Sequence, residues 1–511
     1  MRALISVYDK TGLVPFARGL ADLGFELVAS GGTASALAAE ELPVTPVEEV
    51  TAFPELLAGR VKTLHPRIHA GILARRGVPD DLAQLDEHAI APFDLVCVNL
   101  YPFEVVAEQP GADEEEILEM IDVGGPAMLR AAAKNHPHVV PVCRPEDYDL
   151  VLRELGEGDG ATSAETRRRL AGIAFARTAA YDAAIARWFE HEDAFPETFV
   201  PVFRRDRELA YGENPHQRAA YYGERGGRTH LLSFVEQLGG KPLSFNNLND
   251  LSAARLLARE LQHPACVIVK HANPCGVAVA DSVDEAYAKA LAADPVSAYG
   301  GVVVLNRPVS EALGHELAEQ FLEVLFAPGF DEAALAALSR RTGLRILSHE
   351  ERRAPDETEL DYRRVIGGLL VQERDPTVAD ASGMEVVCGN VSEEQWPDLL
   401  FAWRVAKHVT SNAIVLARDG RTIGIGAGQM SRVDAVRIAV EKARELGHAV
   451  EGSVLASDAF FPFADGPEIA LEAGVAALIQ PGGSKRDAEV TDAVRASGAA
   501  MVFTHRRHFR H

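Results

Sequence analysis

Short β-strands and helices alternate along residues 1–75, and this order restricts the fold more than any other feature of the chain. Ala3–Val7 has the pattern of a strand, Leu13–Leu23 that of an amphipathic helix, and Glu26–Ala29 that of a second strand, after which another helix begins. Further strands are predicted at 94–100 and 139–143. Strands joined by helices pair in parallel, so this part of the chain is predicted to form a parallel α/β sheet.

The loops after the first strands carry groups that suit a phosphate. Ser30–Thr33 reads Ser-Gly-Gly-Thr between a strand and a helix, where glycines allow close approach and the helix offers free N–H groups. Lys10–Gly12 adds a cation after the first strand, and Arg60–Pro66 adds two more with a hydroxyl. One such loop alone is more often an ordinary helix cap. Their clustering in an acidic chain favours a phosphorylated ligand.

A second candidate site follows the apolar run Val267–Val269, which reads as a buried strand and delivers Lys270 and His271 side by side. Asn273-Pro274, with Gly276, is predicted to form the bend that ends this strand. A cation and a proton acceptor at a strand end suit catalysis. A solvated lysine beside a core histidine explains the pair equally well, because Lys-His is not a specific motif.

Length and charge limit the class of protein. With 511 residues the chain exceeds what one core supports, and a boundary is predicted in the proline-bounded segment Phe195–Pro201. The 51 basic and 75 acidic residues give a net charge of −24, which disfavours nucleic acid as a partner. The five cysteines are scattered, and neither a leader nor an apolar run of the ~20 residues that a membrane span needs is evident. These features predict a soluble, cytoplasmic protein without membrane contact.

Two tempting motifs are rejected. Gly424–Gly428 resembles a dinucleotide fingerprint, but its third glycine is not at the required spacing and it follows a predicted hairpin with its turn at Asp419-Gly420. His271–Cys275 resembles part of a zinc deaminase motif, but Asn273 replaces the required Glu and Ala278 the second Cys. Neither a nicotinamide site nor a zinc site is therefore expected.

Taken together, many segments of the chain resemble one family in the correct order. They are Ser6–Gly12, Ser30–Thr33, Arg60–Pro66, Asn99–Phe103, the segments of Asp122 and Lys134, Tyr211–Gln217, Lys270-His271, Ser411-Asn412, Gly424–Arg432, Ser457–Phe463 and Arg507–His511. The family is that of the bifunctional purine-biosynthesis proteins that join IMP cyclohydrolase to AICAR transformylase. The resemblance implies a methylglyoxal-synthase-like cyclohydrolase domain at 1–198 and a transformylase domain at 199–511, made of two cytidine-deaminase-like subdomains. It also implies a homodimer.

For the cyclohydrolase, the resemblance assigns phosphate binding and proton transfer to separate groups. The phosphate residues are Lys10, Ser30, Gly32, Thr33, Arg60 and Thr63. Those for proton transfer and charge stabilisation are Lys62, Tyr101, Asp122 and Lys134, with acid and base not distinguished. From the residues alone, Asp122 is a carboxylate at the start of one helix and Lys134 a cation at its end, and the helix dipole favours both placements.

For the transformylase, the resemblance implies 10-formyltetrahydrofolate as cosubstrate and no catalytic metal. It makes His271 the base and Lys270 the group that stabilises charge at the formyl oxygen or protonates the leaving folate nitrogen. Asn412 would orient the histidine or the transferred formyl group. Residues lining the nucleotide site are Tyr211, Asn247, Arg432, Phe460 and Arg507.

One departure and two alternatives accompany the resemblance. Ala210 stands where the family usually has an Arg that binds phosphate, which puts the phosphate contact in doubt unless Arg204, Arg205 or Arg207 compensates. A non-catalytic sensor of phosphorylated metabolites would need only the binding residues. A hydrolase of the deaminase type would need the missing zinc ligands.

Overall fold

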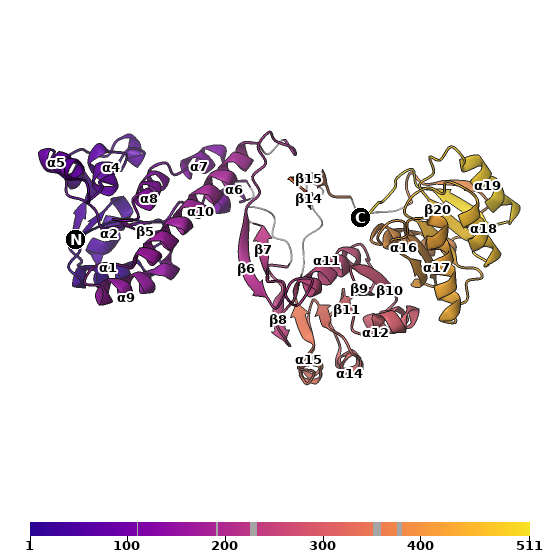
Figure 1. Ribbon diagram of the computed structural model, residues 1–511. Helices are drawn as coiled ribbons and strands as arrows, with labels where there is room; N and C mark the ends of the chain where they lie inside the picture. The colour runs from indigo at the N-terminus through magenta and orange to yellow at the C-terminus, as the bar shows by residue number, and fades with distance from the viewer. Residues whose placement is uncertain (110, 191–192, 225–231, 351–358, 376–380) are drawn as a thin grey trace. The chain divides into compact units, whose positions relative to one another are not determined.

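The chain forms two compact units, Met1–Val202 and Phe203–His511, in a computed structural model (Figure 1). The structure describes residues 1–109, 111–190, 193–224, 232–350, 359–375 and 381–511. Among these residues, no helix has the length and apolar character needed to cross a membrane.

The first unit is built on the parallel sheet that the alternating pattern predicts. Its strands run in the order β3-β2-β1-β4-β5, and each neighbouring pair is parallel. Their bounds are β1 Arg2–Ser6, β2 Glu26–Ala29, β3 Val44–Pro46, β4 Leu95–Val98 and β5 Val140–Val142. The strands are apolar on both faces because a separate core packs against each face, one including α1 (Leu13–Asp22) and the other α8 (Gly124–Lys134).

The strand order fixes where this unit can bind a ligand. The chain leaves β1 towards β2 on one side and returns to β4 on the other. The loops beyond the carboxyl ends of these strands therefore diverge, and parallel α/β sheets bind ligands in the crevice left between such loops.

The second unit contains two copies of one module, which share a sheet of twelve strands. The first module comprises α11 (Phe245–Arg259), β9 (Ala265–Lys270), β10 (Asn273–Val279), α12 (Val283–Ala293), β11 (Val302–Leu305), α14 (Glu311–Glu319), β12 (Val324–Ala327), α15 (Glu332–Ser339) and β13 (Arg345–Ser348), with the short helix α13 (Pro295–Ala298) inserted. The second comprises α16 (Gln395–Lys407), β17 (Ile414–Arg418), β18 (Arg421–Gly426), α17 (Arg432–Glu445), β19 (Val454–Ser457), α18 (Asp465–Glu472), β20 (Ala477–Gln480), α19 (Asp487–Ala496) and β21 (Ala500–Phe503). Within each module an antiparallel hairpin continues into parallel strands.

The modules meet at β10 and β18. Ala278 pairs with Arg421, and the buried Thr422 hydroxyl accepts a hydrogen bond from Val277 N at 3.1 Å. On one face of the sheet, a single core that includes Leu257 of α11 and Trp403 of α16 extends across both modules. The joint is therefore held mainly by side chains, since few backbone pairs cross it.

In each module, a glycine lets a helix lie directly on a strand. A Cβ at Gly276 of β10 would lie 2.1 Å from the carbonyl oxygen of Ala290, and one at Gly424 would lie 2.1 Å from that of Ala439. Backbone oxygens of helices have no room to withdraw, so any side chain at these positions would push the helix off the sheet.

We therefore expect Gly276→Ala to lower the free energy of unfolding of the second unit by about 2 kcal/mol or more through overpacking. Urea unfolding followed by circular dichroism measures it. Gly343→Ala is the control, because a Cβ there meets no atom within 4 Å. Equal stability of the two variants would contradict the packing argument.

Candidate active sites

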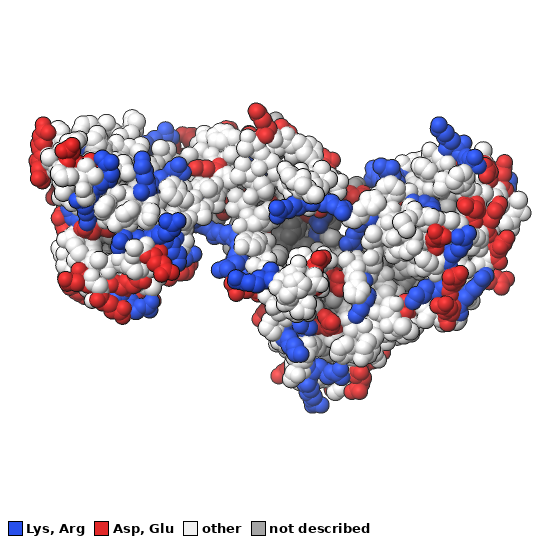
Figure 2. Space-filling view, in the orientation of Figure 1, with Lys and Arg blue, Asp and Glu red and all other residues white. Residues whose placement is uncertain are grey.

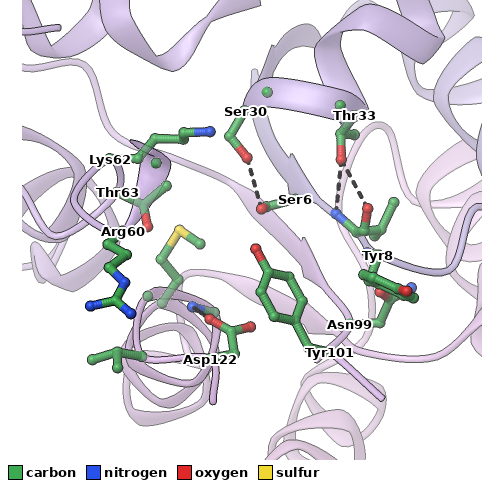
Figure 3. Close-up of a pocket in the computed structure, with 18 of the residues that line it drawn as sticks. Ser6, Tyr8, Ser30, Thr33, Arg60, Lys62, Thr63, Asn99, Tyr101 and Asp122 are labelled. Carbon is green, nitrogen blue, oxygen red and sulfur yellow. Dashed lines mark hydrogen bonds between the residues drawn. The ribbon is translucent and has the colours of Figure 1, made fainter. Parts of the chain in front are cut away.

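The first unit contains a cavity of about 680 Å³ at the predicted crevice (Figure 3). Segments that follow β1, β2 and β4 line it, joined by residues 59–63 and 121–125. Of the residues that the sequence assigned to the cyclohydrolase, those lining this cavity are Lys10, Ser30, Gly32, Thr33, Arg60, Lys62, Thr63, Tyr101 and Asp122.

One wall is the amino-terminal end of α2 (Gly31–Ala39), as the Ser-Gly-Gly-Thr loop predicts. The Ser30 hydroxyl lies 2.8 Å from that of Ser6, and the Thr33 hydroxyl accepts from Val7 N at 3.0 Å while donating to Val7 O at 3.1 Å. These bonds fix the loop after β1 against the loop after β2. A Cβ at Gly32 would meet nothing within 4 Å, so an anion has space to approach the helix N–H groups.

Two of the cations that line the cavity have carboxylate partners. Lys62 Nζ lies 2.8 Å from Glu55 Oε2, and Arg60 forms an ion pair with Glu119. Glu119 raises the pKa of Arg60, chiefly through its hydrogen bond. A phosphate entering this cavity must therefore compete with carboxylates that the chain itself supplies. Sequence reasoning missed both acids, because pairs distant in sequence leave no local pattern.

Asp122 and Tyr101 occupy the opposite side of the cavity, where the Tyr101 hydroxyl points inward (Figure 3). Asp122 Oδ1 accepts from Gly125 N at 2.8 Å, and its backbone N–H donates to Tyr181 OH at 2.7 Å. Burial raises the pKa of Asp122, although the Gly125 N–H opposes the shift. Burial also raises the pKa of Tyr101, with Asp122 adding to the rise and Lys62 opposing it. Asp122 and Lys62 thus act in opposite directions on the protonation of Tyr101.

Lys134 is not brought to this cavity. It is the exposed last residue of α8, whose first residues, Gly124 and Gly125, line the cavity. Eleven residues of helix separate these ends by about 15 Å. This arrangement is the alternative that the residues alone suggested, with Asp122 beside the start of the helix and Lys134 at its end.

In the second unit, Lys270 and His271 lie where β9 turns into β10, and the predicted bend is in a different place. The turn consists of His271 and Ala272, with φ of +52° and +59°, while Asn273-Pro274 already belongs to β10. Lys270 Nζ donates to the carbonyl oxygens of Tyr299 at 3.1 Å and Gly300 at 3.0 Å. His271 is exposed, so it is not the core histidine of the alternative interpretation.

Asn412 and Arg432 form a polar network in the other module. The Asn412 side chain accepts from Arg432 Nη2 at 2.7 Å and donates to Gln429 O at 2.8 Å. Arg432 is buried and also pairs with Asp458. The Asn273 side chain accepts from Thr410 N at 2.9 Å and so connects the His271 turn to the segment that carries Asn412.

The other transformylase residues differ in what their side chains contact. Asn247 lies within α11, and its side chain is buried in a capping box with Ser244 and donates to Glu323 at 3.0 Å. Arg507 packs over the Phe509 ring. Phe460 is 38% exposed, and Tyr211 is half-buried. No group of three or more His, Cys, Asp or Glu that could hold a metal is found in the part of the chain that the structure describes.

Comparisons with known proteins relate the whole chain to one family. The family model described as "AICARFT/IMPCHase bienzyme" matches residues 132–442, and an "MGS-like domain" model matches residues 12–127. The "Bifunctional purine biosynthesis protein PurH" of Rhodospirillum rubrum is 52% identical, with 100% of this chain and 98% of the relative covered.

The chain belongs to the AICARFT/IMPCHase bienzyme family. The protein of the same name from Sorangium cellulosum is also 52% identical, over 100% of this chain and 99% of that protein. A solved structure, "Crystal structure of ForH", is 42% identical over 37% of this chain and 98% of its own, with a TM-score of 0.35. This member of the family is accordingly a bifunctional AICAR transformylase and IMP cyclohydrolase.

In this bienzyme, a buried ion cluster ties the two modules of the second unit together. Glu260, at the end of α11, accepts from Lys407 Nζ at 2.7 Å and from His408 Nε2 at 2.8 Å, both at the end of α16. Burial alone would raise the pKa of Glu260, but the His408 hydrogen bond and the nearby charges lower it to about 2.

A folded-state pKa below the ordinary 4.5 means that Glu260 stabilises the fold above that pH, and the gain is lost as the pH falls towards 2. We expect Glu260→Gln to cost about 3 kcal/mol at pH 7, because Lys407 loses its buried partner. Between pH 6 and 4 the parent should lose about 1 kcal/mol more than the variant. Urea unfolding at each pH measures both, with the exposed Glu441→Gln as control.

Proposed function

We propose that the cavity of the first unit, within a domain at 1–198, closes the formylated intermediate to IMP, and that the domain at 199–511 carries out formyl transfer. The observation that carries this assignment is the arrangement of the cavity, in which the amino terminus of α2, with Lys62 near it, lies across from Asp122 and Tyr101 (Figure 3). A nucleotide phosphate bound at the amino terminus of α2 would place the nucleobase beside Asp122 and Tyr101.

In ring closure both reacting groups belong to one molecule, so the main task of the enzyme is to hold the reactive conformer and to move protons. The carboxamide nitrogen attacks the formyl carbon of the same molecule and loses one proton, the formamide nitrogen loses a second as its C=N bond forms, and the formyl oxygen gains both protons and leaves as water. Asp122, Tyr101 and Lys62 are the groups that we propose move these protons. The phosphate is held by Lys10, Arg60, Thr63 and the Ser30–Thr33 segment, with the Thr33 hydroxyl fixing the loop.

For Lys134 we propose an indirect role. A cation at the carboxyl end of a helix stabilises the last turn through the helix dipole. Lys134 occupies that position in α8, which presents Gly125 to Asp122 at its other end.

In formyl transfer, the 5-amino group of AICAR attacks the formyl carbon of 10-formyltetrahydrofolate. The amine is a weak nucleophile, because its lone pair is delocalised, so a base must accept its proton during attack. We propose His271 as this base and Lys270 as the group that stabilises the formyl oxygen or protonates the leaving folate nitrogen. Asn412 orients the reactants, and Tyr211, Asn247, Arg432, Phe460 and Arg507 surround the nucleotide.

The remaining proposals concern the setting of the enzyme. Its partners are the nucleotide and folate substrates and a second copy of the chain in a homodimer. It acts in the cytoplasm and needs no catalytic metal. Figure 2 shows acidic side chains gathered over α5 (Pro79–Glu87), in keeping with the net charge of −24 and with a partner other than nucleic acid.

Two substitutions should separate the activities. Asp122→Asn removes a proton acceptor and should lower IMP formation from the formylated intermediate at least about 100-fold, while His271→Ala should lower formyl transfer by a similar factor. Each variant should keep the other activity, since the residues lie in different units. Separate assays of the two steps measure this, with the exposed Asp86→Asn and His263→Ala as matched controls. Loss of both activities in either variant would contradict the assignment.

The absence of an arginine at Ala210 should weaken AICAR binding. Ala210 is exposed and follows β6 (Phe203–Leu209), over which basic side chains gather in Figure 2. Arg205 and Arg207 there pair with Glu208 and Asp206, so neither is a free substitute. We expect Ala210→Arg to lower the KM for AICAR several-fold with kcat unchanged. Equal KM values would show that the lost cation is compensated.

A further inference from the structure

The turn that carries His271 is built without glycine. A two-residue hairpin turn of type I′ has positive φ at both of its residues, a conformation for which pairs such as Asn-Gly are strongly preferred. Here His271 and Ala272 adopt φ of +52° and +59°. Positive φ is unfavourable for residues that carry a Cβ, so other contacts must hold the turn in this conformation.

A carboxylate from a neighbouring helix makes one such contact. Asp250, in the second turn of α11, accepts a hydrogen bond from Ala272 N through Oδ1 at 2.7 Å. Burial raises the pKa of Asp250, while the N–H groups of Ala272 and His271 lower it. The carboxylate thus faces the backbone of both turn residues.

The other side of the turn is held by the neighbouring strand. Asn273 donates to His271 O at 3.3 Å and accepts from Thr410 N at 2.9 Å, two residues before Asn412. The His271 backbone is therefore fixed between α11 and the segment that presents Asn412. Removing the α11 contact would leave the turn held from one side only.

We infer that Asp250 is a positioning residue for formyl transfer, which holds the glycine-free turn so that the His271 side chain faces the substrate amine. This inference rests on the proposed role of His271 as the base. Asp250 acts through the backbone and does not touch the reacting atoms.

The test is Asp250→Ala in the full-length enzyme. Misplacing a catalytic group by about 1 Å can cost about 100-fold, so kcat for formyl transfer should fall about 30- to 100-fold with KM for AICAR changed less than about threefold. Adding Ala272→Gly should restore about fivefold or more of the lost kcat, because glycine adopts positive φ without the contact. A residue with a merely structural role would not be rescued by a glycine in the turn.

The controls use the same chain. Cyclohydrolase activity should be unchanged in each variant, and Asn249→Ala, an exposed neighbour on α11, should keep formyl transfer. Ala272→Gly alone should stay within about twofold of the parent. If Asp250→Ala does not fold, Asp250→Asn with and without Ala272→Gly repeats the comparison, and the glycine should again raise kcat.

The outcomes separate the inference from its premise. Formyl transfer that survives His271→Ala would overturn the proposed base and the inference with it. Loss of transfer in His271→Ala together with full activity in Asp250→Ala would overturn the inference alone. A double variant no faster than Asp250→Ala would also overturn it, because the turn would not be what Asp250 holds.

Discussion

Both units depend on one constraint, which is that backbone hydrogen bonding ends where strands end. Groups beyond the last paired residue are free to meet a ligand, and the strand order decides which groups lie together. In the first unit the order around β1 opens the crevice between the loops of β2 and β4. In the second, the pairing of β10 with β18 brings the hairpin of one module beside the segment before β17 of the other. The parallel sheet of the first unit and the mixed sheet of the second thus both bring polar side chains together at strand ends, although their strands are connected differently.

The charges of the sites show a second common feature. Arg60, Lys62 and Arg432 each have a carboxylate partner within the chain. An exposed pair such as Arg60 with Glu119 contributes little to stability and is easily exchanged for a phosphate. The buried pair of Arg432 with Asp458 is costly to break, since it would leave an uncompensated charge. Arg432 is therefore better suited to fix Asn412 than to move towards a ligand.

Much of the first unit could be predicted from sequence because its signals are local. Apolar runs of strand length and the Ser30–Thr33 loop locate the sheet edge and most of the cavity. Local signals failed where distant residues decide the structure. The bend after β9 was placed at Asn273-Pro274, because nothing in His271-Ala272 marks a turn that Asp250 holds from another helix. The roles of Lys134 and of the two glutamates beside the cavity depend on geometry that spacing does not encode.

The repeated module has a consequence for motion. His271 and Asn412 belong to different modules, and few backbone pairs join them at β10 and β18. A small rotation of one module about this joint would change the separation of the two side chains without deforming either fold. The Glu260 cluster and the Asn273 contact both resist such a rotation. In the proposed formyl-transfer site, these contacts therefore help to keep His271 and Asn412 at a fixed separation.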